Sequence, residues 1–472
     1  MSSRIVVLLF ILLFAQGCTS ATGTKQNDQE ASPLPPSPLL MQIGSGWMAH
    51  MVCSSVFISG RTLDHVMAVE FGPGSDPVLS ALMPQVDVDR KTVTVPAPEY
   101  DYEGQTAVYR DGLGCALSLD EPVKALRAVT IPPRQIRYSD DELWPQGERV
   151  YTEDDSIDYG ALQAAMDSAI GHSVEGRGTR GVVVVHRGRL VGEAYAPGYS
   201  PRMALYGASM TKTVNAMLIG RLVQAGKLSV TDTRLHPQWG HPGDPRGAIT
   251  LDELLRAVSG LEFVENYAGD ADVNVMLLTK KDMAGFAATK PLVAEPGTHW
   301  SYSSGTANII SGIARATFKG DDDAWLRYPD EALFEPLGLR TAIFETDTAG
   351  TFVGSSFLWA SPRDFARLGL LMLQDGVWED ERLLPEGWVD YMATPHPGNE
   401  NLNYGAQTWL SGAKDARGPA PFYYMSGFGG QTVWMDPEHE LVIVRMGWDF
   451  ATDPWHMNDF ADVVAGTISN PR

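Results

Sequence analysis

Two residues near the middle of the chain, Ser209 and Lys212, have the types and the spacing that a nucleophile and its base require. They open the stretch GASMTKTVNAMLIGRLVQAGKL at 207–228, which predicts a long helix that starts at the serine. Side chains three positions apart share one face of a helix, so the amine would reach the hydroxyl. A lysine held away from water has a lowered pKa and can accept the hydroxyl proton. The pair therefore predicts nucleophilic attack by the serine.

The Ser-x-x-Lys pattern by itself is weak, because about one or two copies are expected by chance in a chain of this length. A second copy, Ser411 and Lys414, lies in SGAKDARGPAP, whose glycine, proline and charge indicate a loop. The first copy also fits an ordinary polar helix N-terminus. Further motifs are needed to decide between catalysis and capping.

A tyrosine and two serines, Tyr302, Ser303 and Ser304, follow a Pro-Gly turn and precede a predicted helix, TANIISGIAR. A tyrosine beside a lysine ammonium can act as a general base or carry a proton. Aromatic packing under a loop is the alternative interpretation.

A third motif, MSGFGGQTVWM at 425–435, places three glycines ahead of a predicted strand. Glycine lets a backbone approach a ligand closely, and an N–H group of such a strand can donate to an oxyanion. Glycine before a strand is also an ordinary way to end a loop.

In this order, the three motifs resemble those of the serine β-lactamase and penicillin-recognising superfamily, on the side of class C enzymes, esterases and 6-aminohexanoate-dimer hydrolases. The resemblance covers roughly residues 155 to 465. It includes GRLVGEAYAPGY, YGASMTKT, PGTHWSYSSGTAN, ASPRDFARLGLLMLQDGVW, LPEGWV and GFGGQTVWMDPE. It implies that Ser209 is acylated, that Lys212 is its base or relay, and that Tyr302 is their catalytic partner. It also implies an oxyanion hole made by the backbone N–H groups of Ser209 and Gln431.

Two positions depart from the pattern of that superfamily. Ser304 stands where the second motif usually ends in Asn, and Phe428 stands where the third usually begins with Lys or His, ahead of Gly429 and Gly430. A basic residue there would bind the carboxylate of a β-lactam or of a peptide C-terminus. Its loss costs about 1.5–3 kcal/mol on the scale of charged hydrogen bonds. We therefore expect these four residues to bind an ester or amide that lacks a free carboxylate.

Tyr267, in GLEFVENY, loosely resembles an aromatic residue on a mobile loop of the 6-aminohexanoate-dimer hydrolases, which implies contact with substrate. A structural role fits equally well. Two other functions stay open. One is a β-lactamase or D-Ala-D-Ala carboxypeptidase, and the other is an inactive binding lipoprotein that keeps the same fold.

Several other classes of protein lack support in the sequence. There is no G-x-S-x-G elbow, no H-E-x-x-H metal motif and no glycine-rich phosphate loop after a strand. We therefore expect no metal and no cofactor. The formal net charge of −22, from 36 basic and 58 acidic residues, disfavours nucleic acid as a partner. The expected partner is a small ester or amide.

The first residues predict export. Arg4 and an apolar run at 5–15 precede Gln16, Gly17 and Cys18, so residues 1–17 have the composition of a signal peptide. AQGC resembles a bacterial lipoprotein box, which implies a lipid anchor on Cys18, although plain cleavage also fits. We expect an exported bacterial protein of the periplasm or cell envelope.

The two remaining cysteines, Cys53 and Cys115, would form one disulfide in an oxidising compartment. Two buried free thiols are the alternative.

Four segments must position these groups. After the signal peptide, residues 18–39 form a proline-rich tether, and 40–140 form a small β-rich accessory domain. Its strands are expected at HVMAVEF, KTVTV and GQTAVYR. Residues 150–472 form the hydrolase domain. Its fold class is α+β, with one antiparallel sheet flanked by helices and a helical subdomain.

Local patterns place the elements of that domain. We expect hairpins at 181–199 and at 431–447, the latter turning at Asp436-Pro437. Helices are expected from Ser156 onward, over 361–376 and after 456. In the second of these, Ser361 is the predicted N-cap and Asp364 closes a capping box.

Overall fold

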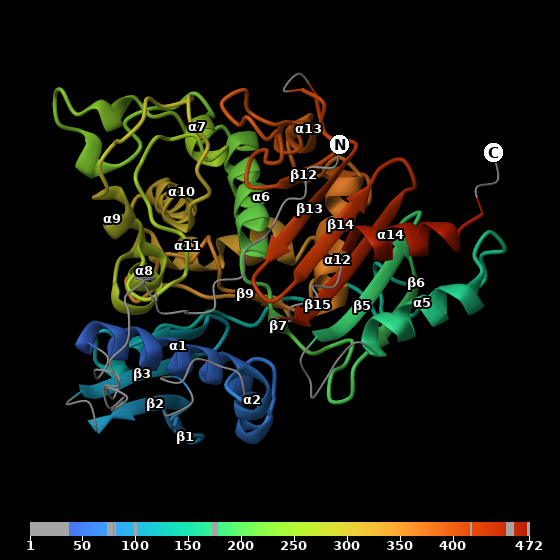
Figure 1. The fold of residues 1–472 in the computed structure, drawn as a ribbon, viewed down its shortest axis with the longest axis horizontal. Helices are drawn as coiled ribbons and strands as arrows, with labels where there is room; N and C mark the ends of the chain where they lie inside the picture. The colour runs from blue at the N-terminus through green and yellow to red at the C-terminus, as the bar shows by residue number, and fades with distance from the viewer. Residues whose placement is uncertain are drawn as a thin grey trace, which may run out of the picture.

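A six-stranded antiparallel sheet, in the order β12-β13-β14-β15-β5-β6, dominates the computed structural model (Figure 1). Residues 37–72, 79, 82–98, 102–171, 178–415, 418–449 and 457–469 are described. The predicted signal peptide and Cys18 lie outside them. Both expected hairpins and the antiparallel class are confirmed. The strands are β5 Gly178–His186, β6 Arg189–Tyr195, β12 Trp409–Ser411, β13 Phe422–Gly427, β14 Gln431–Asp436 and β15 Leu441–Trp448.

Both faces of this sheet are covered, which explains the unbroken valines of β5. Side chains alternate between the faces of a strand, so Val182 and Val184 point to one side and Val183 and Val185 to the other. The first pair packs with α5 Tyr159–Gly171 and α14 Met457–Gly466. The second pair packs on the side of α12 Pro362–Leu373.

The helix α12 is where the predicted capping box is wrong. Ser361 does cap it, accepting from the Asp364 N–H at 3.2 Å. The Asp364 carboxylate, however, accepts from the backbone N–H groups of Arg340 and Thr341 at 2.9 and 2.7 Å, and from Arg367. The Asp364 carboxylate therefore binds the loop at residues 340–341 and does not cap the N-terminus of α12.

A helical region lies beside the sheet, with α6 between the two (Figure 1). Four of its helices, α6 to α9, pack against α10, whose apolar face is buried. They are α6 Met210–Gln224, α7 Leu251–Leu255, α8 Asp272–Thr279, α9 Met283–Ala288, α10 Ser304–Ala316 and α11 Asp322–Pro329. A small sheet in the order β7-β9-β8, made of Leu205–Tyr206, Leu358–Ala360 and Ile343–Phe344, leads into α6.

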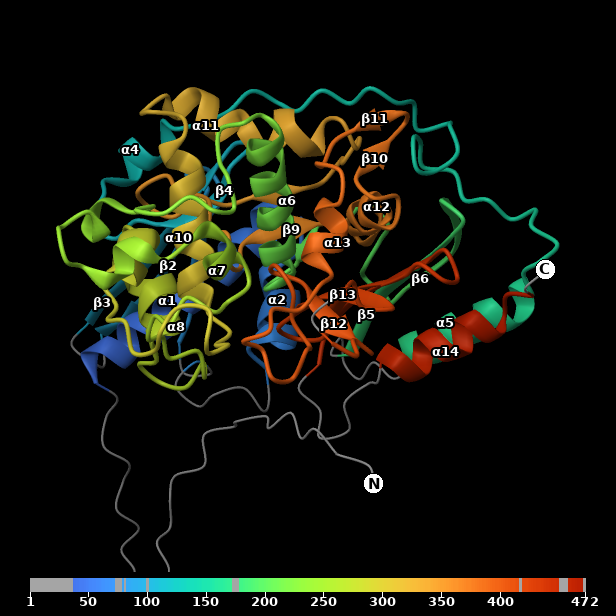
Figure 2. The same cartoon turned by 90° about the horizontal axis from the view of Figure 1, so that it is seen from above.

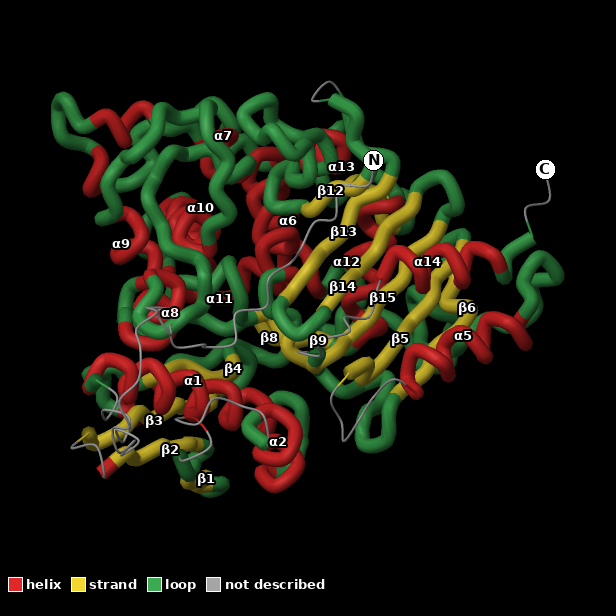
Figure 3. Tube along the Cα trace, in the orientation of Figure 1, coloured by secondary structure: helices red, strands yellow, loops and turns green. Residues whose placement is uncertain are grey.

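The N-terminal unit contains more helix than the sequence indicates (Figure 3). Its four-stranded sheet is β1 Gln85–Asp87, β2 Thr92–Ala97, β3 Tyr102–Arg110 and β4 Gly114–Leu117. The strands expected at KTVTV and GQTAVYR are confirmed, but HVMAVEF lies in the helix α2 Leu63–Glu70. Its buried Val66 and Val69 are three positions apart, a helical spacing, and Thr62 caps the first turn.

The helix α1, Pro38–Phe57, was not predicted, and its first turn includes the last two residues of the expected tether. It packs against β2, β3 and β4 on one side and against α8 on the other. A Cβ atom on Gly46 would lie 3.1 Å from the Leu278 carbonyl of α8, so the two helices approach closely. Cys53 on α1 is bonded to Cys115 on β4, which confirms the expected disulfide. No helix among the described residues combines the length and apolarity needed to cross a bilayer.

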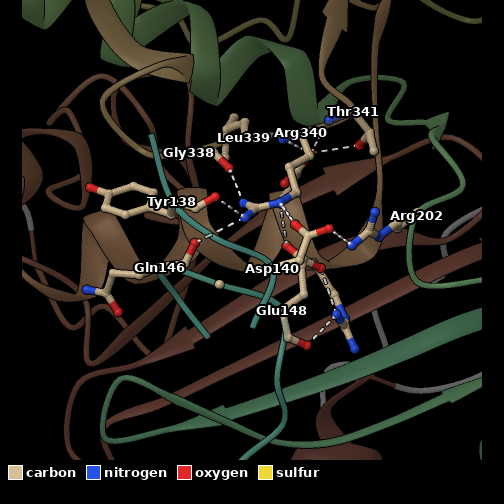
Figure 4. Close-up of polar contacts among 12 residues, drawn as sticks. Tyr138, Asp140, Gln146, Glu148, Arg202, Gly338, Leu339, Arg340 and Thr341 are labelled. Carbon is tan, nitrogen blue, oxygen red and sulfur yellow. Dashed lines mark hydrogen bonds and ion pairs between the residues drawn. The ribbon is translucent and has the colours of Figure 1, made fainter. Parts of the chain in front are cut away.

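An extended segment, residues 128–158, joins the N-terminal unit to α5 and runs along one side of the molecule (Figure 2). Figure 4 shows how Arg340 holds it: the guanidinium pairs with Asp140 at 3.1 Å and Glu148 at 3.2 Å. It also donates to the carbonyls of Tyr138 and Gln146 at 3.3 Å. These contacts make the segment a fixed part of the structure.

Candidate active site

The strand β7 and a tight turn deliver Ser209 to the start of α6. The turn needs a glycine, because a Cβ atom on Gly207 would lie 2.5 Å from the ring of Phe365. Ala208 has a φ of 48°, in the left-handed region, and Ser209 is the N-cap residue. Its side chain makes no capping hydrogen bond and is partly exposed. The hydroxyl is therefore available for another partner.

That partner is Lys212, one turn further along α6. Its side chain is buried, and its Nζ lies 3.0 Å from Ser209 Oγ. Nζ also lies 3.0 Å from Ser304 Oγ and 2.9 Å from the Ser355 carbonyl oxygen. Burial lowers the pKa of Lys212 to about 8, although the charge of Glu265 acts to raise it. Burial therefore increases the fraction of the amine that is neutral near neutral pH, and the neutral amine is the form that accepts a proton.

Tyr302 completes the group that the sequence predicted. The Lys212 Nζ lies 4.8 Å from the centroid of its ring, which stacks on Trp409 at 5.3 Å. Burial raises the pKa of Tyr302, the charge of Glu265 raises it further, and a hydrogen bond with Ser209 lowers it. Three side chains from two distant motifs thus converge on one place.

Ser304, predicted to bind substrate, is the first residue of α10, behind its N-cap Ser303, and its Oγ lies 3.0 Å from Lys212 Nζ. It has a second partner, Glu265, which the sequence interpretation missed. The Glu265 carboxylate accepts from Ser304 Oγ at 2.5 Å, from Ser304 N at 2.7 Å and from Tyr267 Oη at 3.0 Å. The one available signal was its place two residues before Tyr267 in GLEFVENY.

The glycine motif lies against the nucleophile turn. A Cβ atom on Gly427, at the end of β13, would be 2.5 Å from the Gly207 carbonyl oxygen, so only glycine fits. Gly429 and Gly430 both have a φ of 81°. The side chain of Gln431 is buried and bonds the N–H and carbonyl of Gly447. The oxyanion role of its backbone N–H stays a prediction.

Two groups of aromatic rings lie among the residues of the candidate site. Tyr267 and Phe428 are 44% and 41% exposed, and their ring centroids are 6.0 Å apart. In the second group, Tyr302, Tyr404 and Trp409 form a cluster with centroid separations of 5.0 to 5.7 Å. Glu265 is the only charged side chain that shifts the pKa of Lys212 in the described part of the chain. This environment suits an uncharged, apolar substrate.

The other Ser-x-x-Lys copy shows none of these features. Ser411 ends the edge strand β12, and Lys414 is an exposed loop residue. The loop interpretation is thus confirmed for Lys414 and wrong for Ser411, which belongs to a strand.

Comparison with known proteins agrees with the motifs. A family model described as Beta-lactamase matches residues 166–459. A 6-aminohexanoate-dimer hydrolase from Paenarthrobacter ureafaciens is 24% identical over 310 residues, which cover 59% of this chain and 75% of that protein.

Solved structures show the same fold. A Bacillus anthracis protein that carries the name 6-aminohexanoate-dimer hydrolase has a TM-score of 0.51 at 20% identity, covering 74% of this chain and 94% of that one. A penicillin-binding protein homologue from Caulobacter crescentus has a TM-score of 0.51 at 17% identity, covering 67% of this chain and 98% of that one.

Proposed function

We propose, from the premise that the chain belongs to the Beta-lactamase family of serine hydrolases, that it cleaves an ester or amide through an acyl-enzyme on Ser209. The observation that carries this proposal is the 3.0 Å contact between Lys212 Nζ and Ser209 Oγ. A buried amine with a lowered pKa at that distance can remove the hydroxyl proton during attack.

The proposed reaction has two halves. Ser209 Oγ attacks the carbonyl carbon while Lys212 takes the proton, and the oxygen that becomes negative is bound by the backbone N–H groups of Ser209 and Gln431. The bond to the leaving group then breaks, and the leaving alcohol or amine takes a proton from Tyr302, which regains one from Lys212. In the second half, water attacks the acyl carbon while Lys212 takes one of its protons. The bond to Ser209 Oγ then breaks, the serine oxygen takes that proton from Lys212, and the acid is released.

The raised pKa of Tyr302 supports a relay role for its phenol. A phenol whose pKa lies above its ordinary value stays protonated at neutral pH, so it can donate to a leaving group. For the same reason the phenolate, which is the form that could accept a proton, is scarce at neutral pH. Lys212 is accordingly the proposed base, and Tyr302 is the proposed proton carrier.

The substrate is proposed to lack a free carboxylate. Phe428 occupies the position of the usual basic residue, and it contacts the rings of Tyr267 and Trp448. The Paenarthrobacter relative is named as a hydrolase of the 6-aminohexanoate dimer, whose units are joined by an amide bond. This supports an amide as the bond that is cleaved, and it does not bear on the missing carboxylate, because a linear dimer keeps one. A β-lactamase or D-Ala-D-Ala carboxypeptidase is the second candidate, and an inactive binding lipoprotein is the third.

Export with a lipid on Cys18 is also proposed. The Cys53–Cys115 disulfide supports an oxidising compartment. In cells supplied with a labelled fatty acid, the label should be covalently attached to the wild-type protein in the membrane fraction, and it should be absent from Cys18→Ala. Equal release of both proteins from the membrane would argue for plain signal cleavage.

The decisive experiment is labelling by a fluorophosphonate, in which Ser209 Oγ bonds to phosphorus and fluoride leaves. The wild-type protein and Ser411→Ala should be labelled, and Ser209→Ala should not. Because Ser209 makes no capping bond, its loss should leave the melting temperature nearly unchanged. An unlabelled, folded wild-type protein would favour the binding lipoprotein.

A substrate panel separates the enzymatic candidates. Aryl esters, linear amide oligomers and a chromogenic cephalosporin should be compared by kcat/KM. We expect turnover of an ester or amide, and strong turnover of the cephalosporin would overturn the argument from Phe428.

A further inference from the structure

The starting observation is a set of hydrogen bonds behind the proposed base. Glu265 receives three donors: the hydroxyl of Ser304 at 2.5 Å, its backbone N–H at 2.7 Å, and the hydroxyl of Tyr267 at 3.0 Å. A carboxylate that receives several donors acts as an acceptor only. The single hydrogen of the Ser304 hydroxyl is therefore committed to Glu265.

That commitment fixes what Ser304 can offer to Lys212. With its hydrogen directed elsewhere, Ser304 Oγ has only lone pairs for the amine 3.0 Å away. The Ser355 carbonyl oxygen, at 2.9 Å, is also an acceptor only. A neutral lysine amine has two hydrogens and one lone pair, so both hydrogens are used on these two acceptors. The lone pair is left for the third neighbour, Ser209 Oγ.

We infer that Glu265 is a positioning residue, which acts through Ser304 to direct the lone pair of Lys212 at the Ser209 hydroxyl. The inference rests on the proposed function of Ser209 and Lys212. It also accounts for Ser304 at a position where the second motif usually ends in Asn. An asparagine amide oxygen accepts from lysine without help, whereas a serine hydroxyl does so only when another group takes its hydrogen.

Loss of Glu265 should have two separable effects. The Ser304 hydroxyl becomes free to donate to the lone pair of Lys212 and competes with Ser209, which lowers the maximal rate. The negative charge that raises the pKa of Lys212 is also lost, so the amine becomes neutral at a lower pH. A purely structural role would not move the pH profile in this direction while lowering the plateau.

The test measures the rate of fluorophosphonate labelling of Ser209 across pH. For Glu265→Ala we expect a plateau on the order of ten- to a hundredfold lower, at or below the lower end of the contribution of a general base, because Lys212 is misdirected but still present. Its midpoint should lie at a lower pH than that of the wild type. The matched control is Glu262→Ala, an exposed carboxylate of the same loop, which should match the wild type.

The Ser304→Asn background distinguishes action through Ser304 from other effects. In Ser304→Asn, adding Glu265→Ala should lower the maximal labelling rate by less than about threefold. The asparagine amide oxygen accepts from Lys212 without a carboxylate to take a hydrogen from it. The shift of the midpoint should persist, since the charge acts directly on Lys212. An equal plateau loss in both backgrounds, or an unchanged profile in Glu265→Ala, would overturn the inference.

Two further results keep the outcomes distinct. If Glu265→Ala does not fold, Glu265→Gln replaces it, because its amide has one acceptor oxygen for the two Ser304 donors and should give a smaller loss of the same kind. If the folded wild-type protein is not labelled at Ser209 at all, the proposed function fails. Normal labelling with no dependence on Glu265 rejects only the positioning role.

Discussion

Lys212 and Glu345 are two buried ionisable groups in different regions, and burial brings the pKa of each to about 8 from opposite directions. Lys212 lies in the candidate active site. Glu345 lies between the N-terminal unit and the rest of the chain. Its carboxyl group accepts from Ser54 Oγ at 2.7 Å, from Cys115 N at 2.6 Å and from Trp359 Nε1 at 2.9 Å, and it lies 3.3 Å from His50 Nε2.

The neighbours of the two groups separate their roles. Each partner of Glu345 belongs to an element that it joins, namely α1, β4 or β9, so its hydrogen bonds connect parts of the fold. Two partners of Lys212, Ser304 and Ser355, are also buried, but its third is the partly exposed hydroxyl of Ser209. A strongly shifted pKa is therefore weak evidence for catalysis until the group also touches a nucleophile that a substrate can reach.

The largest expected effect is that of Lys212→Met. Activity should fall on the order of 10²- to 10⁴-fold, the usual contribution of a general base. The pKa of Lys212 falls from 10.5 when unfolded to about 8 when folded, so the unfolded chain binds more protons in between. The wild-type stability should therefore rise with pH over that window, and the variant should lose this rise.

Urea unfolding at several pH values and kcat/KM at one pH measure both quantities. Lys414→Met, in the exposed copy of the motif, is the matched control and should keep activity and stability. Retained activity in Lys212→Met would show that Lys212, like Glu345, has a structural role and is not the base.

The next effect is that of Glu345→Ala, which should lower the free energy of unfolding by about 3 kcal/mol. The change strands three buried donors, and each unmet donor costs about 1–3 kcal/mol before relaxation. Burial raises the pKa of Glu345 from 4.5 in the unfolded chain to about 8 in the folded protein. Its contribution to stability is therefore complete below pH 4.5 and is lost as the pH rises through about 8.

Unfolding curves measure the loss, and kcat per folded molecule should be unchanged. A fall in kcat without a fall in stability would show that the junction communicates with the active site.

The smallest effect is the pH dependence of the wild-type enzyme. If neutral Lys212 is the base, kcat/KM should rise about tenfold per pH unit below the pKa and level off above about 8. A profile that is flat from pH 6 to 9 would mean that the amine does not titrate in the rate-limiting step.

The sequence predicted the central residues because their motifs are local. Ser209 and Lys212 share one helical turn, and Tyr302 follows a recognisable Pro-Gly turn. Glu265 escaped prediction because its role depends on residue 265 lying beside residue 304, which no local pattern encodes. Its identity as a carboxylate was visible, but its partner was not.

The misassigned elements have a similar cause. The helix α1 is apolar on nearly all sides because it is covered on two sides, so it lacks the periodicity that marks a surface helix. HVMAVEF has the valines of a strand, but tertiary packing of Val66 and Val69 selects a helix. Asp364 has the right position for a capping box, but its carboxylate accepts from the backbone N–H groups of Arg340 and Thr341, which are more than twenty residues away in the sequence.

The placement of α1 between the N-terminal sheet and α8 limits how this protein can be shortened. A version that began at residue 150 would keep the entire family match at 166–459. It would also uncover the apolar side of α8 and leave Glu345 without the donors of Ser54 and Cys115. The hydrolase domain expressed alone would therefore expose surface that is normally interior, and the segment from α1 to β4, residues 38–117, belongs in any expressed form.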